Sequence, residues 1–553
     1  MNKTCTQCKN QYDVTPDDLG FYEKMGVPVP VLCPDCRFRR RAVWRNEMVF
    51  YSRKCELCGK SIVSMFHPKS PYTVYCGDCW TSDKWNPFSY GRDYDFDRPF
   101  FEQLGELFRD VPKPGTFASA DTGPNINSDW TNFSGGNKDC YLIFNSGPNN
   151  ENCAYSRGLL SDKDVFDSYY VDKAERVYEG VNVQSSNGAC WLQNSSDCID
   201  SWFLLNCVGC QNCFGCVNLR HKSYHFFNEL LNKEEWEQKV KEILGSNERT
   251  EEMRRKFEEF SLKFPRRENS NLKSINVSGD YIFESKNCKN SFEVSFSEDS
   301  SNLFSVKRTK DSRDLIGHGR EGELLLEGVA VGTSRRVIGS WWAVLSHDIE
   351  YSIAPRSSEY CFGCDSVKSA KYAILNKRYS EEEYKKIKEH IANELKEKNL
   401  YGLYMPPELA FFAYNETIAQ DNMPLTKEEA LKRGFRWQED LQMTTGKETL
   451  KPEQIPDHIK DVIENILKEI LACISCGRNY RITKQEFDFY KRMNIPIPRK
   501  CFYCRHADRL RRRGPFKLYA RNCAKCNKEI QTTYAPERPE VVYCEECYQK
   551  EVI

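Results

Sequence analysis

The chain opens with four Cys-x-x-Cys pairs: CTQC (residues 5–8), CPDC (33–36), CELC (55–58) and CGDC (76–79). It closes with four more: CISC (473–476), CFYC (501–504), CAKC (523–526) and CEEC (544–547). Each cysteine of the second set follows its counterpart by 468 residues. Two copies of one cysteine-rich segment therefore bracket the 553 residues, and the rest of the chain lies between them.

Each pair places two thiolates on one tight turn, and two pairs complete the tetrahedral four-sulfur site typical of structural zinc. Interleaved pairing, disulfides and an iron–sulfur centre are the alternatives. No ligand position is left open for water, so we expect about four structural zinc ions that supply folding energy. Pairing in chain order predicts these ligand sets: Cys5, Cys8, Cys33 and Cys36; Cys55, Cys58, Cys76 and Cys79; Cys473, Cys476, Cys501 and Cys504; Cys523, Cys526, Cys544 and Cys547.

The segment CTQCKNQYDVTPDDLGFYEKMGVPVPVLCPDCR (5–37) carries a family resemblance. Its Cys-x-x-Cys, Phe-Tyr-x-Lys, Pro-x-Pro and Cys-x-x-Cys-Arg pattern resembles a short bacterial zinc domain of the zinc-ribbon or treble-clef type. The copy at 473–505 matches it, with Arg492 in place of Lys24. The whole layout is similar to uncharacterised bacterial cysteine-rich proteins, which implies zinc and no particular activity. We define four cysteine modules, treble-clef-like at 1–46 (module 1) and 473–514 (module 3), and zinc-ribbon-like at 47–90 (module 2) and 515–553 (module 4).

Basic residues follow the second cysteine pair of modules 1 and 3. On a helix beside a zinc site, with aromatic residues nearby, they suit contacts with phosphates and bases. They also suit charge compensation, because a zinc ion held by four thiolates carries about −2, and a nearby arginine offsets that charge. We keep both interpretations for Arg37, Arg39, Arg40, Arg41, Arg45, Arg505, Arg509, Arg511, Arg512 and Arg513.

Composition narrows the class of protein. The chain has 27 cysteines, 80 Lys+Arg and 80 Asp+Glu, so its formal charge is zero. The N-terminus, MNKTCTQCKN, has no apolar core typical of a signal peptide, and no apolar run reaches the length of a membrane span. Paired cysteines without an export signal favour metal ligands in a reducing compartment, so we expect a cytoplasmic protein.

The centre of the chain repeats with a period of 12 residues. Blocks such as VFDSYYVDKAER and VYEGVNVQSSNG fill residues 129–228 (array 1), and the period returns over 275–376 (array 2). Each block predicts one strand and one turn, and a period held without slippage favours a solenoid. CFGC at 213–216 recurs at 361–364, so the centre is also duplicated. The predicted fold class is therefore multidomain and mainly β, with helical connectors.

Helices are expected in the connecting segments. Residues 91–128 read as a linker with one short helix before Pro112, and 229–274 as a helical connector opened by Asn232 and Glu235. A helix at 377–400 begins at Ser380. The connector 401–472 predicts one helix started by Thr426 and a last amphipathic helix from Ile459 to Ile470.

Two further motifs are weaker. Cys207, Cys210, Cys213 and Cys216 form CxxCxxCxxC, which lacks ferredoxin spacing and is more typical of core cysteines than of an iron–sulfur run. A shared metal site made of Cys213, Cys216, Cys361 and Cys364 stays open. The glycines of GxGxxG, Gly317, Gly319 and Gly322, are interpreted as turn residues, because no long helix follows them.

No catalytic motif is found, and no small-molecule substrate is evident. The sequence favours a non-enzymatic zinc protein that binds RNA, the ribosome or other nucleic acid through its arginine-rich helices. The alternative is a protein-interaction scaffold built on the arrays, with purely structural zinc. An iron–sulfur redox protein that uses the Cys207 to Cys216 run is the third hypothesis.

Overall fold

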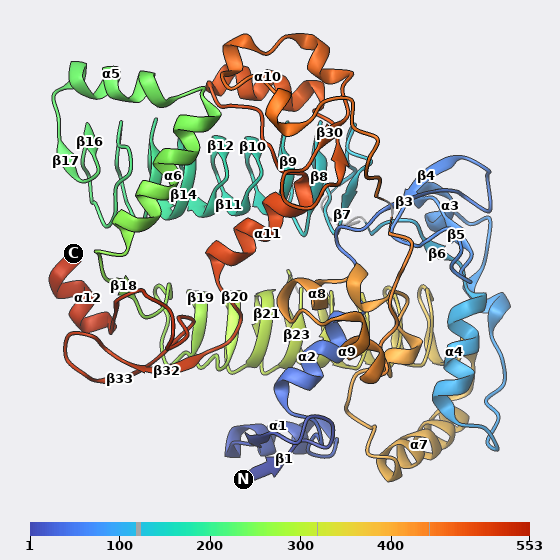
Figure 1. The fold of residues 1–553 in the computed structure, drawn as a ribbon. Coiled ribbons are helices and arrows are strands. Elements are labelled where there is room, and N and C mark those ends of the chain that lie inside the picture. The colour runs from blue at the N-terminus through green and yellow to red at the C-terminus, as the bar shows by residue number, and fades with distance from the viewer. Residues whose placement is uncertain (118–122, 318, 442, 553) are drawn as a thin grey trace. The chain divides into compact units, whose positions relative to one another are not determined.

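The computed structural model describes residues 1–117, 123–317, 319–441 and 443–552 (Figure 1). Its contacts divide the chain into two compact units. The first unit comprises Met1–Gly115, Asn269–Asp440 and Phe516–Leu518, and the second comprises Thr116–Glu268, Leu441–Pro515 and Tyr519–Ile553. Modules 1 and 2 therefore share a unit with array 2, and modules 3 and 4 with array 1. Each module lies with the array that is farther from it in sequence.

Each cysteine module combines a two-stranded hairpin with a helix. In the first unit the hairpins are β1 (Asn2–Thr4) with β2 (Gln11–Asp13) and β3 (Tyr51–Lys54) with β4 (Ser61–Ser64). The helices are α1 (Pro16–Met25), α2 (Pro34–Ala42) and α3 (Gly77–Thr81), and the short strand β5 (Val74–Tyr75) pairs with β6 (Lys113–Pro114).

The second unit repeats these elements. Its hairpins are β30 (Leu471–Ala472) with β31 (Asn479–Tyr480) and β32 (Tyr519–Asn522) with β33 (Glu529–Thr532). Its helices are α10 (Lys484–Met493), α11 (Phe502–Arg513) and α12 (Glu545–Val552), and β34 (Val542–Tyr543) pairs with β18 (Arg266–Arg267).

Array 1 forms a nine-stranded sheet whose ladders are all parallel. Paired residues lie 12 positions apart in most ladders, as in Tyr169↔Val181 and Val177↔Ala189, and 13 apart at Tyr141↔Ala154. β9 and β14 are long enough to pair with different strands along their length, so β9, β10, β12, β14, β13 and β11 form a closed ring. The strands are β7 (Thr131–Asn132), β8 (Tyr141–Phe144), β9 (Ala154–Leu160), β10 (Lys163–Phe166), β11 (Tyr169–Asp172), β12 (Glu175–Tyr178), β13 (Val181–Gln184), β14 (Asn187–Ser196) and β15 (Trp202–Leu205).

Array 2 forms an eleven-stranded sheet with the same register, as in Phe292↔Phe304 and Val337↔Ile349. One extra residue shifts the offset to 13 at Arg313↔Leu326. The strands are β19 (Gly279–Phe283), β20 (Ser291–Ser295), β21 (Ser301–Lys307), β22 (Thr309–Lys310), β23 (Arg313–Ile316), β24 (Gly322–Val329), β25 (Ser334–Ile338), β26 (His347–Glu350), β27 (Glu359–Phe362), β28 (Lys371–Ile374) and β29 (Lys377–Arg378).

The backbone turns at every third residue of the arrays. Left-handed φ angles recur at Asp164, Asp167, Tyr170 and Lys173, and the residue after each of them is buried. Array 2 has about one strand per block, as expected, whereas the strands at 163–166, 169–172, 175–178 and 181–184 of array 1 recur every six residues. The expected single turn per block is replaced by left-handed corners at every third residue. A left-handed corner costs roughly 1–2 kcal/mol for a residue with a Cβ, so ladder hydrogen bonds and core packing must offset it.

The residues that follow the corners form the array cores. Val165, Val171 and Val177 belong to one buried cluster in array 1, and Val294, Val306 and Val337 to another in array 2. Inward serines complete the ladders: the Ser168 hydroxyl donates to the Phe166 carbonyl at 2.9 Å and accepts from the Gly180 amide at 3.1 Å. Inward polar groups are thereby hydrogen-bonded to the backbone, as burial requires.

An asparagine side chain ends each array. In array 2 the Asn376 amide accepts from the Asp365 N–H at 2.7 Å and donates to the Asp365 carbonyl at 2.9 Å. In array 1 Asn228 makes the same two bonds to Val217, at 2.9 and 3.0 Å. The side chain thus takes the place of the backbone of a further strand.

Helices follow these ends. After the hairpin of β16 (His225–Phe226) and β17 (Glu229–Leu230), α5 (Lys233–Ile243) begins at the predicted cap Asn232, and α6 (Asn247–Ser261) begins after a break. In the first unit α7 (Glu381–Glu397) begins at Ser380, which forms a capping box with Glu383. The expected linker helix is α4 (Phe100–Asp110), which packs on array 2 through Phe100 and Phe362.

The connector differs from its prediction at one helix. α9 (Lys427–Lys432) begins at Thr426 as expected and follows the short α8 (Ile418–Asn422). The amphipathic helix from Ile459 to Ile470 is absent: these described residues form two 3₁₀ turns, Ile459–Asp461 and Glu464–Leu467. Ile459 and Ile466 are buried, but Ile463 is 71% exposed, so the apolar residues do not share one buried helical face.

Replacing the array cap should destabilise the first unit. Asn376→Ala leaves a buried N–H and a buried carbonyl of Asp365 unpaired, and each such group costs about 1–3 kcal/mol. We expect chemical denaturation of the zinc-loaded protein to show a loss of about 2–4 kcal/mol. Lys386→Ala, at an exposed position of α7, is the control and should change stability by less than about 0.5 kcal/mol. Equal effects of the two substitutions would contradict the capping role.

Candidate metal centres

The first cysteine pair of each module lies on a knuckle closed by backbone hydrogen bonds. In module 1 the Cys5 amide donates to the Asn10 carbonyl at 2.9 Å, and the Lys9 amide donates to the Cys5 carbonyl at 3.0 Å. The fourth residue after the first cysteine is left-handed in all four modules: Lys9, Gly59, Gly477 and Asn527. Glycine and asparagine adopt this conformation at low cost, which explains three of the four residues.

The second pair of each module opens a helix. Cys33, Cys76 and Cys501 are the N-cap residues of α2, α3 and α11, and Cys544 directly precedes α12. The positive end of a helix dipole lies at its N-terminus and stabilises a thiolate there. The Cys76 amide also donates to the Cys55 sulfur at 3.2 Å, and the Cys544 amide to the Cys523 sulfur at 3.2 Å.

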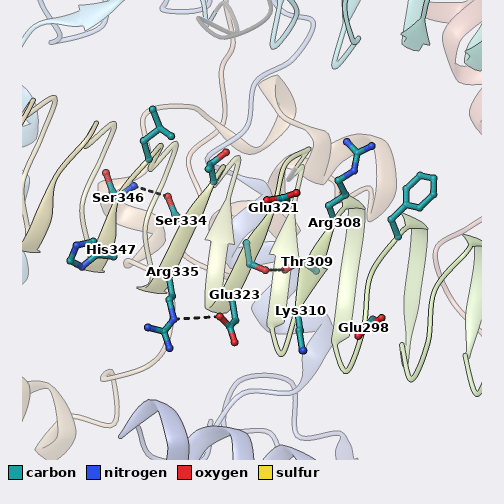
Figure 2. Close-up of a pocket in the computed structure, with 14 residues that line it drawn as sticks. Glu298, Arg308, Thr309, Lys310, Glu321, Glu323, Ser334, Arg335, Ser346 and His347 are labelled. Carbon is teal, nitrogen blue, oxygen red and sulfur yellow. Dashed lines mark hydrogen bonds and ion pairs between the residues drawn. The ribbon is translucent and has the colours of Figure 1, made fainter.

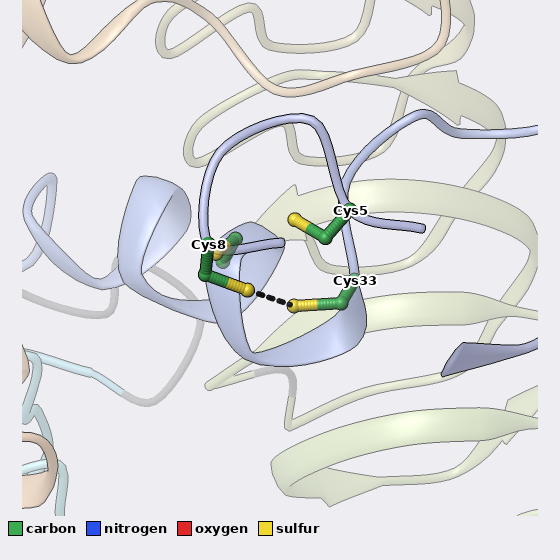
Figure 3. A group of neighbouring side chains, drawn as sticks. Cys5, Cys8 and Cys33 are labelled. Atoms are coloured by element: carbon green, nitrogen blue, oxygen red, sulfur yellow. Dashed lines mark hydrogen bonds between the residues drawn. The ribbon is translucent and has the colours of Figure 1, made fainter. Parts of the chain in front are cut away.

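Four groups of four cysteines bring their Sγ atoms within 4.8 Å of one another, and they are the four sets predicted in chain order. Figure 3 shows Cys5, Cys8 and Cys33 of module 1, with the Cys8 and Cys33 sulfurs 3.6 Å apart. The corresponding distances in modules 2, 3 and 4 are 3.9, 3.7 and 3.7 Å. Sulfurs around a tetrahedral zinc at roughly 2.3 Å lie about 3.8 Å apart, so the four clusters fit such an ion.

Electrostatics favours one thiolate in each cluster, whereas the pKa values of other cluster cysteines, such as Cys36, Cys79, Cys504 and Cys547, are raised. A hydrogen bond from the Cys36 thiol is the main cause that lowers the pKa of Cys33 to about 5. Burial raises the pKa of Cys55, Cys473 and Cys523, but hydrogen bonds from backbone amides outweigh it, and their pKa values fall to about 6, 7 and 6. All 27 cysteines are free thiols, so metal binding does not compete with disulfides.

Modules 1 and 3 agree in detail. Thr15 with Asp18 and Thr483 with Glu486 form capping boxes at the start of α1 and α10. The Tyr12 hydroxyl donates to the Pro30 carbonyl at 2.5 Å, and the Tyr480 hydroxyl to the Pro498 carbonyl at 2.6 Å. The duplication therefore extends from the cysteines to the surrounding structure.

Two predicted arginines of module 1 are buried against array 2. Arg41 donates to the Glu327 carboxylate at 2.6 Å and lies 3.3 Å from Asp314. Arg37 lies 3.0 Å from Asp314 and 3.4 Å from Glu327. All four side chains are at most 3% exposed. Burial raises the pKa of Glu327 to about 7, against the opposing attraction of Arg41 and Arg37.

Module 3 meets array 1 in the same way. Arg505 and Arg509 lie 2.9 and 3.0 Å from Asp167, and Arg509 lies 3.0 Å from Glu179. Arg509 also donates to the Tyr155 carbonyl at 3.1 Å. These two guanidinium groups are at most 5% exposed, so α11 is fixed to the array as α2 is.

The other predicted arginines are less uniform. Arg45 and Arg513 are buried, and Arg45 pairs with Glu47 at 2.6 Å. Arg39 and Arg40 are half-buried, and Arg40 donates to the Tyr404 carbonyl at 2.6 Å. Arg512 pairs with Glu179 at 2.5 Å. Of the ten arginines, all of which the structure describes, only Arg511 is exposed. Six of the ten are therefore unable to reach a phosphate from these positions: Arg37, Arg41, Arg45, Arg505, Arg509 and Arg513.

The array cysteines belong to the cores. Cys207, Cys210, Cys213 and Cys216 are fully buried at successive inward positions, and each thiol donates to a backbone carbonyl two residues earlier. Cys361 and Cys364 are buried in the core of array 2. Within residues 1–117, 123–317, 319–441 and 443–552, no four-cysteine cluster forms outside the modules. Ser352, one 12-residue period before Cys364, donates to a backbone carbonyl in the same way. We therefore interpret these cysteines as packing residues of the cores.

Of the GxGxxG glycines, Gly317 is a left-handed corner residue, whereas Gly322 begins strand β24. Gly317 has φ +66°, and a Cβ there would lie 2.1 Å from a guanidinium nitrogen of Arg45. Gly317 therefore makes room for module 1 where it crosses array 2, and no dinucleotide site is formed.

An open groove lies on one face of array 2 and encloses about 760 Å³ (Figure 2). We call it the array groove. Phe296 and Leu345 line it and are 49% and 48% exposed. The Arg308 guanidinium lies 5.5 Å from the Phe296 ring centre, and Arg335 pairs with Glu323 at 3.4 Å. Its charged lining is balanced, with Glu298, Glu321 and Glu323 against Arg308, Lys310 and Arg335.

Sequence reasoning missed the carboxylates that receive the arginines. A signal exists, because Glu-Gly-Val at 179–181 recurs at 327–329, 148 residues later, as CFGC does. Phe-Asp at 166–167 corresponds to Arg-Asp at 313–314. Acidic residues at matched corners of two mainly apolar arrays would have suggested basic partners.

No protein-family model matches the chain, and no curated protein matches it. The likeness of the modules to zinc-binding domains therefore rests on the four cysteine clusters. None of the helices in the described part of the chain is both long and apolar enough to cross a lipid bilayer.

Metal content should separate cluster cysteines from core cysteines. The purified protein should contain four zinc ions per chain, one for each cluster. Cys36→Ser should lower this to three, because it removes one ligand of module 1. Cys364→Ser is the matched control and should retain four, because serine at Ser352 makes the same kind of bond to a backbone carbonyl. Atomic absorption measures both, and zinc loss in the control would contradict the assignment.

Breaking the buried ion pairs should cost much more than removing an exposed arginine. Arg41→Met leaves two buried carboxylates with one guanidinium, and such a change costs about 3–5 kcal/mol. Arg41→Met combined with Glu327→Met should recover part of that loss. Arg511→Ala, whose side chain is 75% exposed, should change stability by less than about 0.5 kcal/mol. Denaturant unfolding measures the stability of all three variants. A small effect of Arg41→Met would show that the buried ion pairs between module 1 and array 2 do not stabilise the protein.

Proposed function

We propose that this protein is a non-enzymatic, zinc-stabilised scaffold that binds another protein on its repeat arrays. One observation carries the proposal: Arg37, Arg41, Arg505 and Arg509 are buried against carboxylates of the arrays. These were the leading candidates for phosphate contacts. Their charges are paired with carboxylates inside the protein, so modules 1 and 3 serve to hold their helices against the arrays.

Zinc is the metal that the four clusters favour. Four thiolates without a vacant position are the donor set of structural zinc, and the sulfur separations of 3.6–3.9 Å fit its tetrahedral geometry. Cysteine ligands would hold the knuckle to the first turn of the helix in each module. In modules 1 and 3, whose arrangement we interpret as treble-clef-like, the ion would thereby orient the helix that carries the buried arginines.

We interpret each 12-residue block as one full coil of a four-sided β-solenoid. Parallel pairing at an offset of 12, corners at every third residue and one inward side chain per corner support this interpretation. Solenoids present long, regular outer faces, and proteins use such faces to bind partners.

The array groove is the candidate surface for a protein partner. Exposed apolar residues at separate positions, Phe296 and Leu345, suit side chains of an extended polypeptide. Three acidic and three basic side chains line the same groove, which suits a segment of mixed charge. A nucleic acid requires a basic surface, and the balanced lining of the groove lacks that excess.

Groove variants test the proposal. The double variant Phe296→Ser/Leu345→Ser removes both apolar contacts and should lose the proteins that the wild-type chain captures from a bacterial lysate. Leu431→Ser is the matched control, because Leu431 is 52% exposed in the same unit and lies outside the groove. Cross-linking mass spectrometry should place the captured protein at the groove.

The competing outcome is nucleic-acid binding. Electrophoretic shifts with mixed RNA and DNA should show no salt-sensitive complex with the zinc-loaded protein. A shift that Arg511→Glu abolishes would overturn the scaffold in favour of a nucleic-acid protein. Capture that both groove and control variants retain would place the partner elsewhere and reject the groove.

A further inference from the structure

The two arrays present the same carboxylate pair to the two treble-clef-like modules. Asp167 and Glu179 of array 1 receive Arg505 and Arg509, and Asp314 and Glu327 of array 2 receive Arg37 and Arg41. All four carboxylates lie at left-handed corners. The partner that each pair fits is a helix opened by Cys-x-x-Cys, with arginines at the next residue and four residues later. These charges alone do not tell one module from the other.

The neighbouring contacts differ between the units. In the first unit Arg313 lies 2.9 Å from the Asp18 carboxylate and 4.8 Å from the centre of the Phe21 ring. In the second unit Phe166 takes the position of Arg313 and stacks on Phe489, with ring centres 4.2 Å apart. Phe21 and Phe489 are equivalent positions of the two modules, so the difference comes from the arrays.

The equivalent acidic residues of the two modules, Glu486 and Asp18, also differ in their contacts. Glu486, the counterpart of Asp18, accepts from the Tyr155 hydroxyl at 2.7 Å and lies 3.5 Å from Arg505. Its side chain is 1% exposed, whereas that of Asp18 is 19% exposed. The ion-pair partner of Glu486 is thus Arg505 of its own module, whereas Asp18, which also accepts from Thr15, is paired with Arg313 of the array.

We infer that Arg313 and Phe166 decide which cysteine module docks on which array. Module 1 on array 1 would place the Asp18 carboxylate against the Phe166 ring instead of Arg313, and a carboxylate that loses its ion-pair partner at an interface is destabilising. Module 3 on array 2 would lose the stacking of Phe489 on Phe166 and the hydrogen bond from Tyr155 to Glu486. The observed contacts favour module 1 on array 2 and module 3 on array 1, and the exchanged arrangement is disfavoured by the contacts that it loses. Specific interfaces discriminate between partners by such a combination. The inference does not depend on the protein partner proposed above.

Photo-cross-linking in the full-length chain tests this inference. Phe38 of α2 is half-buried and packs on Phe304 of array 2, with ring centres 5.6 Å apart. With p-benzoylphenylalanine at position 38, the wild-type chain should cross-link to β21 of array 2. Exchanging the two deciding residues, in the variant Arg313→Phe/Phe166→Arg, should move a substantial part of the cross-links to β9 and β11 of array 1, because His506, the counterpart of Phe38, lies beside Tyr169.

Cross-links that stay on array 2 in a folded exchange variant with four zinc ions would show that chain connectivity decides, and would overturn the inference. Where the exchange variant fails to fold, charge reversal keeps the test decisive. Asp18→Lys should lower the cross-linking yield on array 2 roughly five- to tenfold, and Asp18→Lys/Arg313→Glu should restore it. A double variant as poor as the single one would also overturn the inference. Asp17→Lys, at the exposed neighbouring residue, is the control and should leave the yield unchanged.

Discussion

Burial of two arginines against two carboxylates is the interaction on which each unit depends. Charges taken out of water are tolerated only when they are paired and hydrogen-bonded. Arg37 and Arg41 meet that condition through Asp314 and Glu327, and Arg505 and Arg509 through Asp167 and Glu179. Both partners must therefore be held in place: the helix by its cysteine cluster, and the carboxylates by the corners of the array. A cysteine module and an array form one folded unit for this reason.

The arrays supply rigid corners for this purpose. A left-handed residue at every third position is unfavourable in isolation, and it persists because neighbouring strands bond to it from both sides. Side chains at such corners point away from the core in a fixed direction. The four carboxylates that receive the buried arginines, Asp167, Glu179, Asp314 and Glu327, all lie at such corners, and Phe166 and Arg313 each directly precede one. The regular backbone, more than any single residue, therefore determines the precision of the contacts.

Much of this arrangement could be predicted from the sequence. Cysteine spacing, repeated at an interval of 468 residues, located all four clusters, because metal ligands leave a pattern that depends on chain order alone. The fate of the arginines could not be predicted, since phosphate contact and burial against a carboxylate require the same residue type. The helix predicted from Ile459 to Ile470 is absent for another reason. Its apolar residues lie in 3₁₀ turns, because tertiary contacts outweigh the helical periodicity of the segment. The corners within a block were not predicted because tyrosine, lysine and arginine occupy them alongside asparagine, aspartate and glycine, so no single residue type marks every corner.

The asparagine caps have a consequence for how such a protein can change over time. A stack of parallel strands exposes unpaired peptide groups at its end, and these can recruit strands from other chains and begin fibrous aggregation. Asn228 and Asn376 occupy the groups of Val217 and Asp365 with a side chain that has no further edge to offer. One backbone position at the end of each array is thereby closed to a further strand. An added 12-residue block that enters upstream of the asparagine keeps this position closed, so the length of an array can change by whole blocks during evolution without exposing it.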